Sequence, residues 1–142
     1  MITSFTGKHR FLSNFYAAPI VYRGDRYPTS EHLYQALKTA KPSERDMVRR
    51  AISPGRAKQL GQTVTLRDSF DSIATMYLVV DTKFKQHEDL AEKLIATSPH
   101  ALIEGNTWND KRWGMVWRHN GWVGENWLGK LLMLKRAELT AD

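Results

Sequence analysis

The sequence lacks cysteine and any long hydrophobic run, and each absence excludes a class of protein. With no Cys among its 142 residues, the chain has no disulfide scaffold, no thiolate zinc site and no cysteine nucleophile. No stretch approaches the roughly 18–20 apolar residues of a membrane span. The N-terminal residues contain no apolar run typical of a signal peptide. We therefore expect a cytoplasmic protein that does not bind membranes.

The composition that is present suits one globular domain over residues 1–142. A hydrophobic fraction of 42% and a charged fraction of 25% are ordinary for such a domain, and the length leaves little room for a second one. There is no low-complexity tract, linker or internal repeat. The apolar content is sufficient for a core without a metal, and we expect neither a metal nor a cofactor.

Acidic residues are fewer than basic ones, which leaves a net charge of +6. This excess favours an anionic partner, and both phosphorylated small molecules and nucleic acids fit. A solvated surface that is merely basic explains the charge equally well.

The pattern of apolar residues and turn signals predicts a helix-rich α+β fold with a few short strands. Short strands are expected at residues 21–27, 101–104, and on both sides of the His119-Asn120-Gly121 turn. Three helices are expected in the first half of the chain: Ser30–Ala40, Ser43 to before Pro54, and a short helix with Gly61 just after its end. Three more are expected after it: Asp68 to about His87, one around Leu90–Ile95 before Pro99, and one from the cap Asn126 to about Leu139.

The segment from Ser30 to Ala40 carries the most chemical information. Glu31, Tyr34, Gln35 and Lys38 have the spacing that places side chains on one face of a helix. A solvated polar face of an amphipathic helix gives the same pattern. The spacing alone therefore does not establish a site.

Two further segments are rich in polar side chains. Residues 104–114 combine carboxylates, amides and two tryptophans in an irregular stretch, which is typical of binding loops but also of turn-rich connections. Residues 124–130 place glycines and Lys130 at a helix start, where free N–H groups can bind phosphate. That segment lacks the spacing of a P-loop, so an ordinary capped helix explains it as well.

The ordered set of motifs resembles the signature of the NADAR/YbiA-like family over nearly the whole chain. The motifs are Phe11-Leu12-Ser13-Asn14-Phe15-Tyr16, Tyr27-Pro28-Thr29-Ser30-Glu31-His32-Leu33-Tyr34-Gln35-Ala36 with Lys38, Lys83-Phe84, Leu94–Thr97, Leu102–Glu104 with Asp110, Trp113-Gly114, and Asn126-Trp127-Leu128-Gly129 leading into Leu132-Met133. Phe70 stands where the family often has tryptophan, and residues 115–123 lack the glycine-rich loop expected after Trp-Gly. Both differences concern substrate choice more than reaction type.

The resemblance implies an N-glycosidase that cleaves the bond between nitrogen and the ribose C1′. Its partner would be either a ribosylamino-pyrimidine phosphate of riboflavin biosynthesis or ADP-ribose attached to guanine in nucleic acid; no obligate protein partner is inferred. Carried over by motif, the catalytic candidates are Glu31, Asp110 and Lys38. The substrate-binding candidates are Arg10, Ser13, Asn14, Tyr34, Gln35, Phe70, Trp113, Gly114 and Asn126.

Cleavage of such a bond needs two carboxylate functions, one for the proton and one for the developing positive charge on the sugar. We assign Glu31 the acid/base role and Asp110 the supporting role. Lys38 would either pair with a phosphate or attack an opened ribose aldehyde. The alternatives are a module that binds ADP-ribose or NAD without cleaving it, and a nucleic-acid-binding domain without chemistry.

Overall fold

The computed structural model describes residues 1–141 and confirms the helix-rich α+β class. The described chain forms six α-helices, one 3-10 helix and two small antiparallel sheets. It divides into two compact units, one made of residues 1–13 with the chain from residue 87 onward, and the other of Asn14–Gln86. No helix in the described part of the chain is long and apolar enough to span a membrane.

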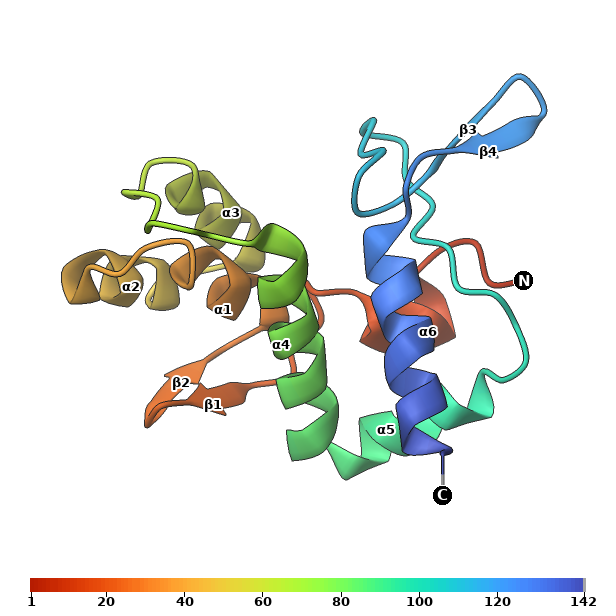
Figure 1. Cartoon of the computed structure of the whole chain (residues 1–142), viewed down its shortest axis with the longest axis horizontal. Coiled ribbons are helices and arrows are strands. Elements are labelled where there is room, and N and C mark those ends of the chain that lie inside the picture. Colours follow the sequence, from red (N-terminus) through yellow and green to blue (C-terminus); the bar gives the residue numbers. More distant parts are fainter. Residues whose placement is uncertain (142) are drawn as a thin grey trace. The chain divides into compact units, whose positions relative to one another are not determined.

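The unit Asn14–Gln86 is built around one short, buried helix. Figure 1 shows this helix, α1, enclosed by α2 and α3 on one side and by α4 on the other. The elements of this unit are β1 (Ile20–Tyr22), β2 (Asp25–Tyr27), α1 (Ser30–Ala36), α2 (Pro42–Arg49), α3 (Pro54–Gly61) and α4 (Ser72–Gln86).

The strand expected at residues 21–27 is a hairpin of two strands. Arg23 and Gly24 both have positive φ, of 51° and 87°, which is the geometry of a tight two-residue turn. Gln86 at the end of α4 holds the hairpin, since its side chain bonds the N–H and the C=O of Val21 at 2.8 and 2.7 Å.

Helix α1 is shorter than predicted, because it ends at Ala36 rather than at Ala40. Thr29 caps its start as expected, with its hydroxyl accepting from His32 N at 3.2 Å. At the other end the N–H groups of Lys38 and Thr39 bond carbonyls only three residues back, which tightens the last turn. Every residue from Ser30 to Ala36 is buried, which excludes the alternative that this helix carries a solvated polar face.

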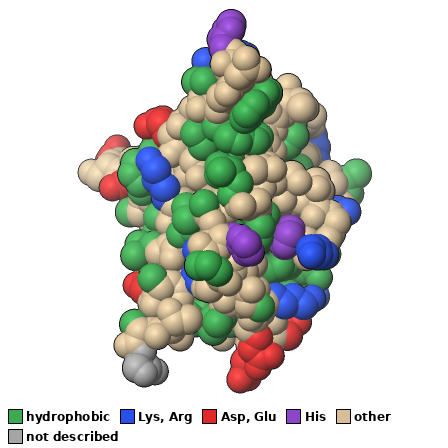
Figure 2. Space-filling view, turned by 90° about the vertical axis from the view of Figure 1, so that its right-hand side faces the viewer, with side chains coloured by type: hydrophobic (Ala, Val, Ile, Leu, Met, Phe, Trp, Pro, Cys, Tyr) green, Lys and Arg blue, Asp and Glu red, His purple; other side chains and the backbone are tan. Residues whose placement is uncertain are grey.

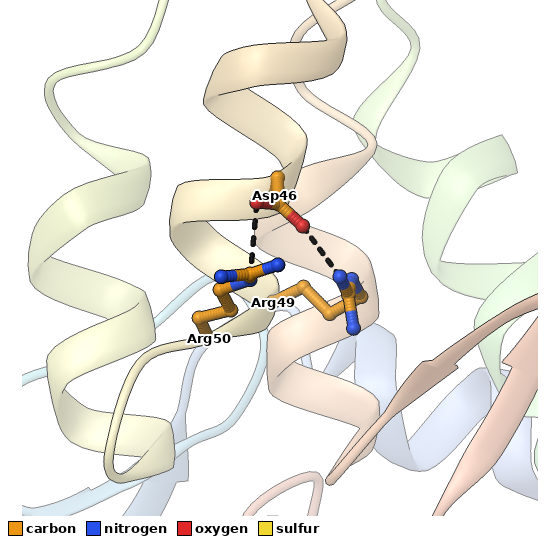
Figure 3. Close-up of polar contacts among 3 residues, drawn as sticks. All are labelled: Asp46, Arg49 and Arg50. Carbon is orange, nitrogen blue, oxygen red and sulfur yellow. Dashed lines mark hydrogen bonds and ion pairs between the residues drawn. The ribbon is translucent and has the colours of Figure 1, made fainter.

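Helix α2 begins at Pro42, one residue before the predicted start, because proline suits the first helical position. Asp46 bonds Arg49 and, at 3.1 Å, Arg50 one turn further along the same helix (Figure 3). The hydrogen bond from Arg49 holds the pKa of Asp46 below its ordinary value. These pairs are solvent-exposed, so they add little to stability.

Two other boundaries also differ from the prediction. Helix α4 starts at Ser72 instead of Asp68, because Ser69 has a positive φ of 57° and Asp71 accepts a bond from Ala74 N at 3.0 Å. Gly61 is the last residue of α3 rather than the residue after its end.

The second unit contains η1 (Gly7–Leu12), α5 (Glu88–Ala96), β3 (Val116–Arg118), β4 (Gly121–Val123) and α6 (Trp127–Leu139). The strand expected at residues 101–104 is reduced to an isolated bridge between Ile2 and Leu102. The hairpin is present, but its turn is His119-Asn120, both with positive φ (53° and 62°). Asn126 occupies the N-cap position of α6 as predicted, but its side chain makes no capping hydrogen bond.

A lysine lies in the core of the unit Asn14–Gln86. Lys83 on α4 is only 2% exposed, and its ammonium lies 5.3 Å from the ring centroid of Phe84 and 5.9 Å from that of Tyr16. Burial lowers its pKa to about 7. The folded protein therefore releases this proton at a much lower pH than the unfolded chain does.

This shift predicts that stability rises with pH above about 7 because of Lys83. Below that value both states hold the proton; above it only the unfolded state does, until about pH 10.5. The wild type should gain up to about 1.4 kcal/mol per pH unit relative to Lys83→Met. Urea unfolding across this range measures the difference. Lys85→Met, at an exposed position on the same helix, is the control, and equal slopes for wild type and Lys83→Met would contradict the prediction.

Candidate active site

Helix α1 brings together the acidic and amide side chains that the sequence singled out. Glu31 is 8% exposed and Gln35 4% exposed. Gln35 Nε2 donates to Glu31 Oε2 at 2.8 Å, which holds one carboxylate oxygen in a fixed position. The backbone of Glu31 is fixed too, because its N–H donates to the carbonyl of Asn14 at 3.0 Å.

Lys38 lies in the turn after α1 rather than on the helix. Its ammonium is 5.6 Å from the ring centroid of Tyr34. Burial lowers the pKa of Lys38, the negative charge of Glu31 raises it, and the positive charge of Lys58 lowers it further. Lys38 is thus electrostatically coupled to Glu31, as the spacing suggested, although the helix does not reach it.

An aromatic pair lies beside these charged groups. Tyr34 and Phe70 meet edge to face, with ring centroids 6.2 Å apart. The guanidinium of Arg67 lies 5.4 Å from the Phe70 centroid. Phe70 is half-buried, so part of its surface is accessible to solvent or ligand.

Arg67 was not identified from the sequence. Its side-chain Nε donates to the carbonyl of Leu37 at 2.8 Å. Its backbone N–H donates to the carbonyl of Lys38 at 2.7 Å. Carbonyls at the end of a helix need such donors. Arg67 is 30 residues from Leu37, so no local pattern could have revealed the contact.

Gly61 has a role at the site that sequence reasoning did not identify, since it was named only as the end of a helix. A Cβ at this position would lie 2.0 Å from Gln35 Oε1 and 2.9 Å from Gln35 Cβ. Only glycine allows α3 to approach α1 this closely. Gln35 Oε1 is buried without a hydrogen-bond partner in the described structure, so Gln35 is held by its bond to Glu31 and by this packing.

Two other residues of the motifs, His32 and Asn14, make buried contacts within this unit. His32 is buried, with its ring nitrogens 2.8 Å from Thr29 Oγ1 and 3.0 Å from the carbonyl of Ala51. Burial lowers its pKa. Asn14 donates to Met76 Sδ at 3.2 Å. A contact of Asn14 with substrate stays a prediction.

The remaining predicted residues lie in the other compact unit. Asp110 Oδ1 accepts from Arg112 N at 3.0 Å and from Trp113 N at 2.9 Å, so this carboxylate caps a turn. Buried Asn106, which the sequence analysis did not single out, bonds both the N–H and the carbonyl of Asp110 at 2.9 Å. The supporting catalytic role of Asp110 stays a prediction.

Asn126 connects the start of α6 to the backbone of residues 102–104. Its side chain accepts from Glu104 N at 3.1 Å and donates to the carbonyl of Leu102 at 2.9 Å. Arg10 is exposed in η1 and Ser13 half-buried just after it, whereas Trp113 is half-buried and Gly114 buried. Contacts of these residues with substrate also stay predictions.

The N–H groups of the first two residues of α6 and of the two residues before it are occupied. Those of residues 125, 126, 127 and 128 donate to the carbonyls of Lys111, Gly114, Arg112 and Trp113 at 2.7–3.2 Å. The helix start is therefore an ordinary capped one. Among the described residues, no group of three or more His, Asp or Glu side chains could hold a metal ion.

Comparisons with known proteins agree with the motif pattern. N-glycosidase YbiA of Shigella flexneri is 40% identical over 134 residues, covering 92% of this chain and 81% of the relative. A riboflavin biosynthesis protein of Vibrio vulnificus is 36% identical over 135 residues, covering 92% of this chain but 36% of its own length. The NMR structure of Escherichia coli YbiA superposes with a TM-score of 0.82 at 36% identity, covering 99% of this chain and 83% of that one. The NADAR domain pattern matches residues 4–140, and this chain belongs to the NADAR domain family.

Proposed function

We propose that this protein is an N-glycosidase that hydrolyses the bond between a base-type nitrogen and the C1′ carbon of a phosphorylated ribosyl substrate. The relatives named N-glycosidase support the reaction class, since they match over most of both chains. The net charge of +6 suits a substrate that carries phosphate.

The observation that carries the proposal is the buried carboxylate of Glu31. Its Oε2 is fixed by Gln35, and its charge acts on the Lys38 ammonium. A carboxyl group held rigidly in a protected position is suited to proton transfer, because little reorganisation is needed during the reaction.

In this mechanism the N–C1′ bond breaks as positive charge develops on the sugar, and a water oxygen bonds C1′. The departing nitrogen takes a proton, which Glu31 supplies or relays. Asp110 is proposed to position water or the ribose hydroxyls. The Tyr34–Phe70 pair offers an aromatic edge against which a flat base could pack.

Lys38 has two possible roles that experiment can separate. Burial lowers its pKa, which increases the fraction of neutral amine able to attack an opened ribose aldehyde. As a cation it would instead pair with a substrate phosphate.

For the substrate, we propose the two classes implied by the sequence motifs. The relatives named for riboflavin biosynthesis favour a ribosylamino-pyrimidine phosphate. ADP-ribosyl-guanine in nucleic acid is the second class, and the basic charge of the chain suits it as well.

Glu31→Gln tests the assignment directly. Turnover of both substrates should fall by at least about 100-fold, because the amide cannot transfer the proton, while the melting temperature stays close to that of the wild type. Release of free ribosyl product measures turnover. Full activity in the variant would exclude Glu31 from the role. If the wild type cleaves neither substrate but binds ADP-ribose tightly, the protein is a binding module.

Gly61→Ala tests whether the packing of Gln35 positions Glu31. The new Cβ must displace Gln35, so we expect kcat to fall roughly 10- to 100-fold and stability to fall by about 1–3 kcal/mol. The matched control is Gly55→Ala in the same helix, where a Cβ meets nothing closer than 3.9 Å. Equal activity of the two variants would contradict the positioning role.

Lys38→Arg and Lys38→Met separate the two roles of Lys38. Arginine keeps the cation but cannot form a Schiff base. If Lys38 pairs with phosphate, the Arg variant should retain most activity and the Met variant should show a raised KM. If Lys38 is a nucleophile, both variants should be inactive, and borohydride should trap substrate on the wild type at Lys38, as peptide mass spectrometry would show.

A further inference from the structure

All five tryptophans of the chain lie within a stretch of twenty residues, from Trp108 to Trp127. This stretch belongs entirely to one compact unit. Two of the rings remain exposed to solvent, Trp108 at 63% and Trp117 at 58%. Such large exposed rings are unusual and often mark an interaction site.

The exposed ring of Trp117 is held in a preorganised hairpin. Trp117 lies directly opposite Trp122 in the β3–β4 pair, and their rings meet edge to face with centroids 5.2 Å apart. Trp122 in turn packs on the backbone at Gly105, where a Cβ would lie 3.0 Å from its Cη2 atom. An edge-to-face contact covers at most one face of either ring, so a flat face of Trp117 stays open.

Cationic side chains occur in the hairpin and in the loop that precedes it. Residues 108–123 contain Lys111, Arg112 and Arg118 but only one carboxylate, Asp110. Arg118 Nη2 donates to Asn109 Oδ1 at 2.6 Å, which links the hairpin to the loop that carries Trp108. Figure 2 shows hydrophobic side chains gathered on the projection at the top of the view, whose tip carries a histidine with a Lys or Arg beside it.

We propose that the β3–β4 hairpin is a stacking platform for an unpaired base of single-stranded nucleic acid, with Trp117 as the stacking ring and the neighbouring cations facing the phosphates. Aromatic rings combined with basic residues are the usual means of binding single strands. The inference goes beyond the proposed hydrolysis, because it requires neither Glu31 nor a modified base.

Two other occupants fit the hairpin less well. A stable protein interface buries about 800 Å² on each partner, far more than two strands of three residues present. A lipid surface would first meet the tip, and the tip carries Arg118, His119 and Asn120 rather than apolar side chains. A single base, in contrast, needs only one open ring.

The test is fluorescence anisotropy of a labelled oligothymidine strand, compared with a duplex of the same length at low salt. Wild type should prefer the single strand. Trp117→Val keeps a strand-forming residue but removes the ring, and should weaken binding about 5- to 100-fold. Trp117→Phe should restore most of the affinity. Leu134→Ala, at a position 48% exposed on α6 of the same unit, is the control, and melting temperatures confirm folding.

Three outcomes would overturn the proposal. Equal affinity of wild type for single strand and duplex, or an unchanged affinity in Trp117→Val, would mean that charge alone drives binding. Preferential binding to phosphatidylglycerol vesicles would show a lipid surface instead. Failure of the hydrolytic proposal gives a different result, because Glu31→Gln should bind the strand as wild type does, and Trp117→Val should still cleave a ribosylamino-pyrimidine phosphate.

Discussion

The burial of α1 is the constraint on which the unit Asn14–Gln86 depends. A seven-residue helix surrounded by protein cannot leave its polar ends to water, so other segments must supply the partners. Thr29 caps the start, the carbonyl of Asn14 receives the N–H of Glu31, and Arg67 bonds the carbonyls at the end. Helices α2, α3 and α4 pack around the same helix. The contacts that stabilise the unit are therefore also the contacts that position Glu31.

Burial lowers the pKa of two lysines in this unit. Burial lowers the pKa of Lys38, but the negative charge of Glu31 counteracts this effect. Lys83, among aromatic rings, bears the larger reduction, to about 7. Keeping such groups in a core costs stability, and proteins accept that cost mainly where function requires it. In this unit the stability cost of burying charged groups falls on Lys38, just after α1, and on Lys83 in α4.

The sequence predicted the elements well wherever local chemistry decides them. Thr29 at the start of α1 and Pro42 as the first residue of α2 act through their nearest neighbours. The sequence did not predict features that depend on contacts between distant segments. The end of α1 depends on Arg67, and the position of Gln35 depends on Gly61, neither of which a single-sequence pattern can connect. The polar spacing on α1 likewise could not distinguish a solvated face from a buried one, because both need the same residues.

In the other unit, the polar residues around Trp-Gly illustrate a different limit of sequence reasoning. Asp110 and Asn126 both bond backbone groups, so the side chains that suggested binding also build the loops. Asp and Asn are favoured in turns for the same hydrogen-bonding capacity that suits ligands. The start of α6 gives the sharper conclusion. Because the carbonyls of Arg112 and Trp113 accept from the N–H groups of Trp127 and Leu128, those two groups are not available to a phosphate at the start of α6.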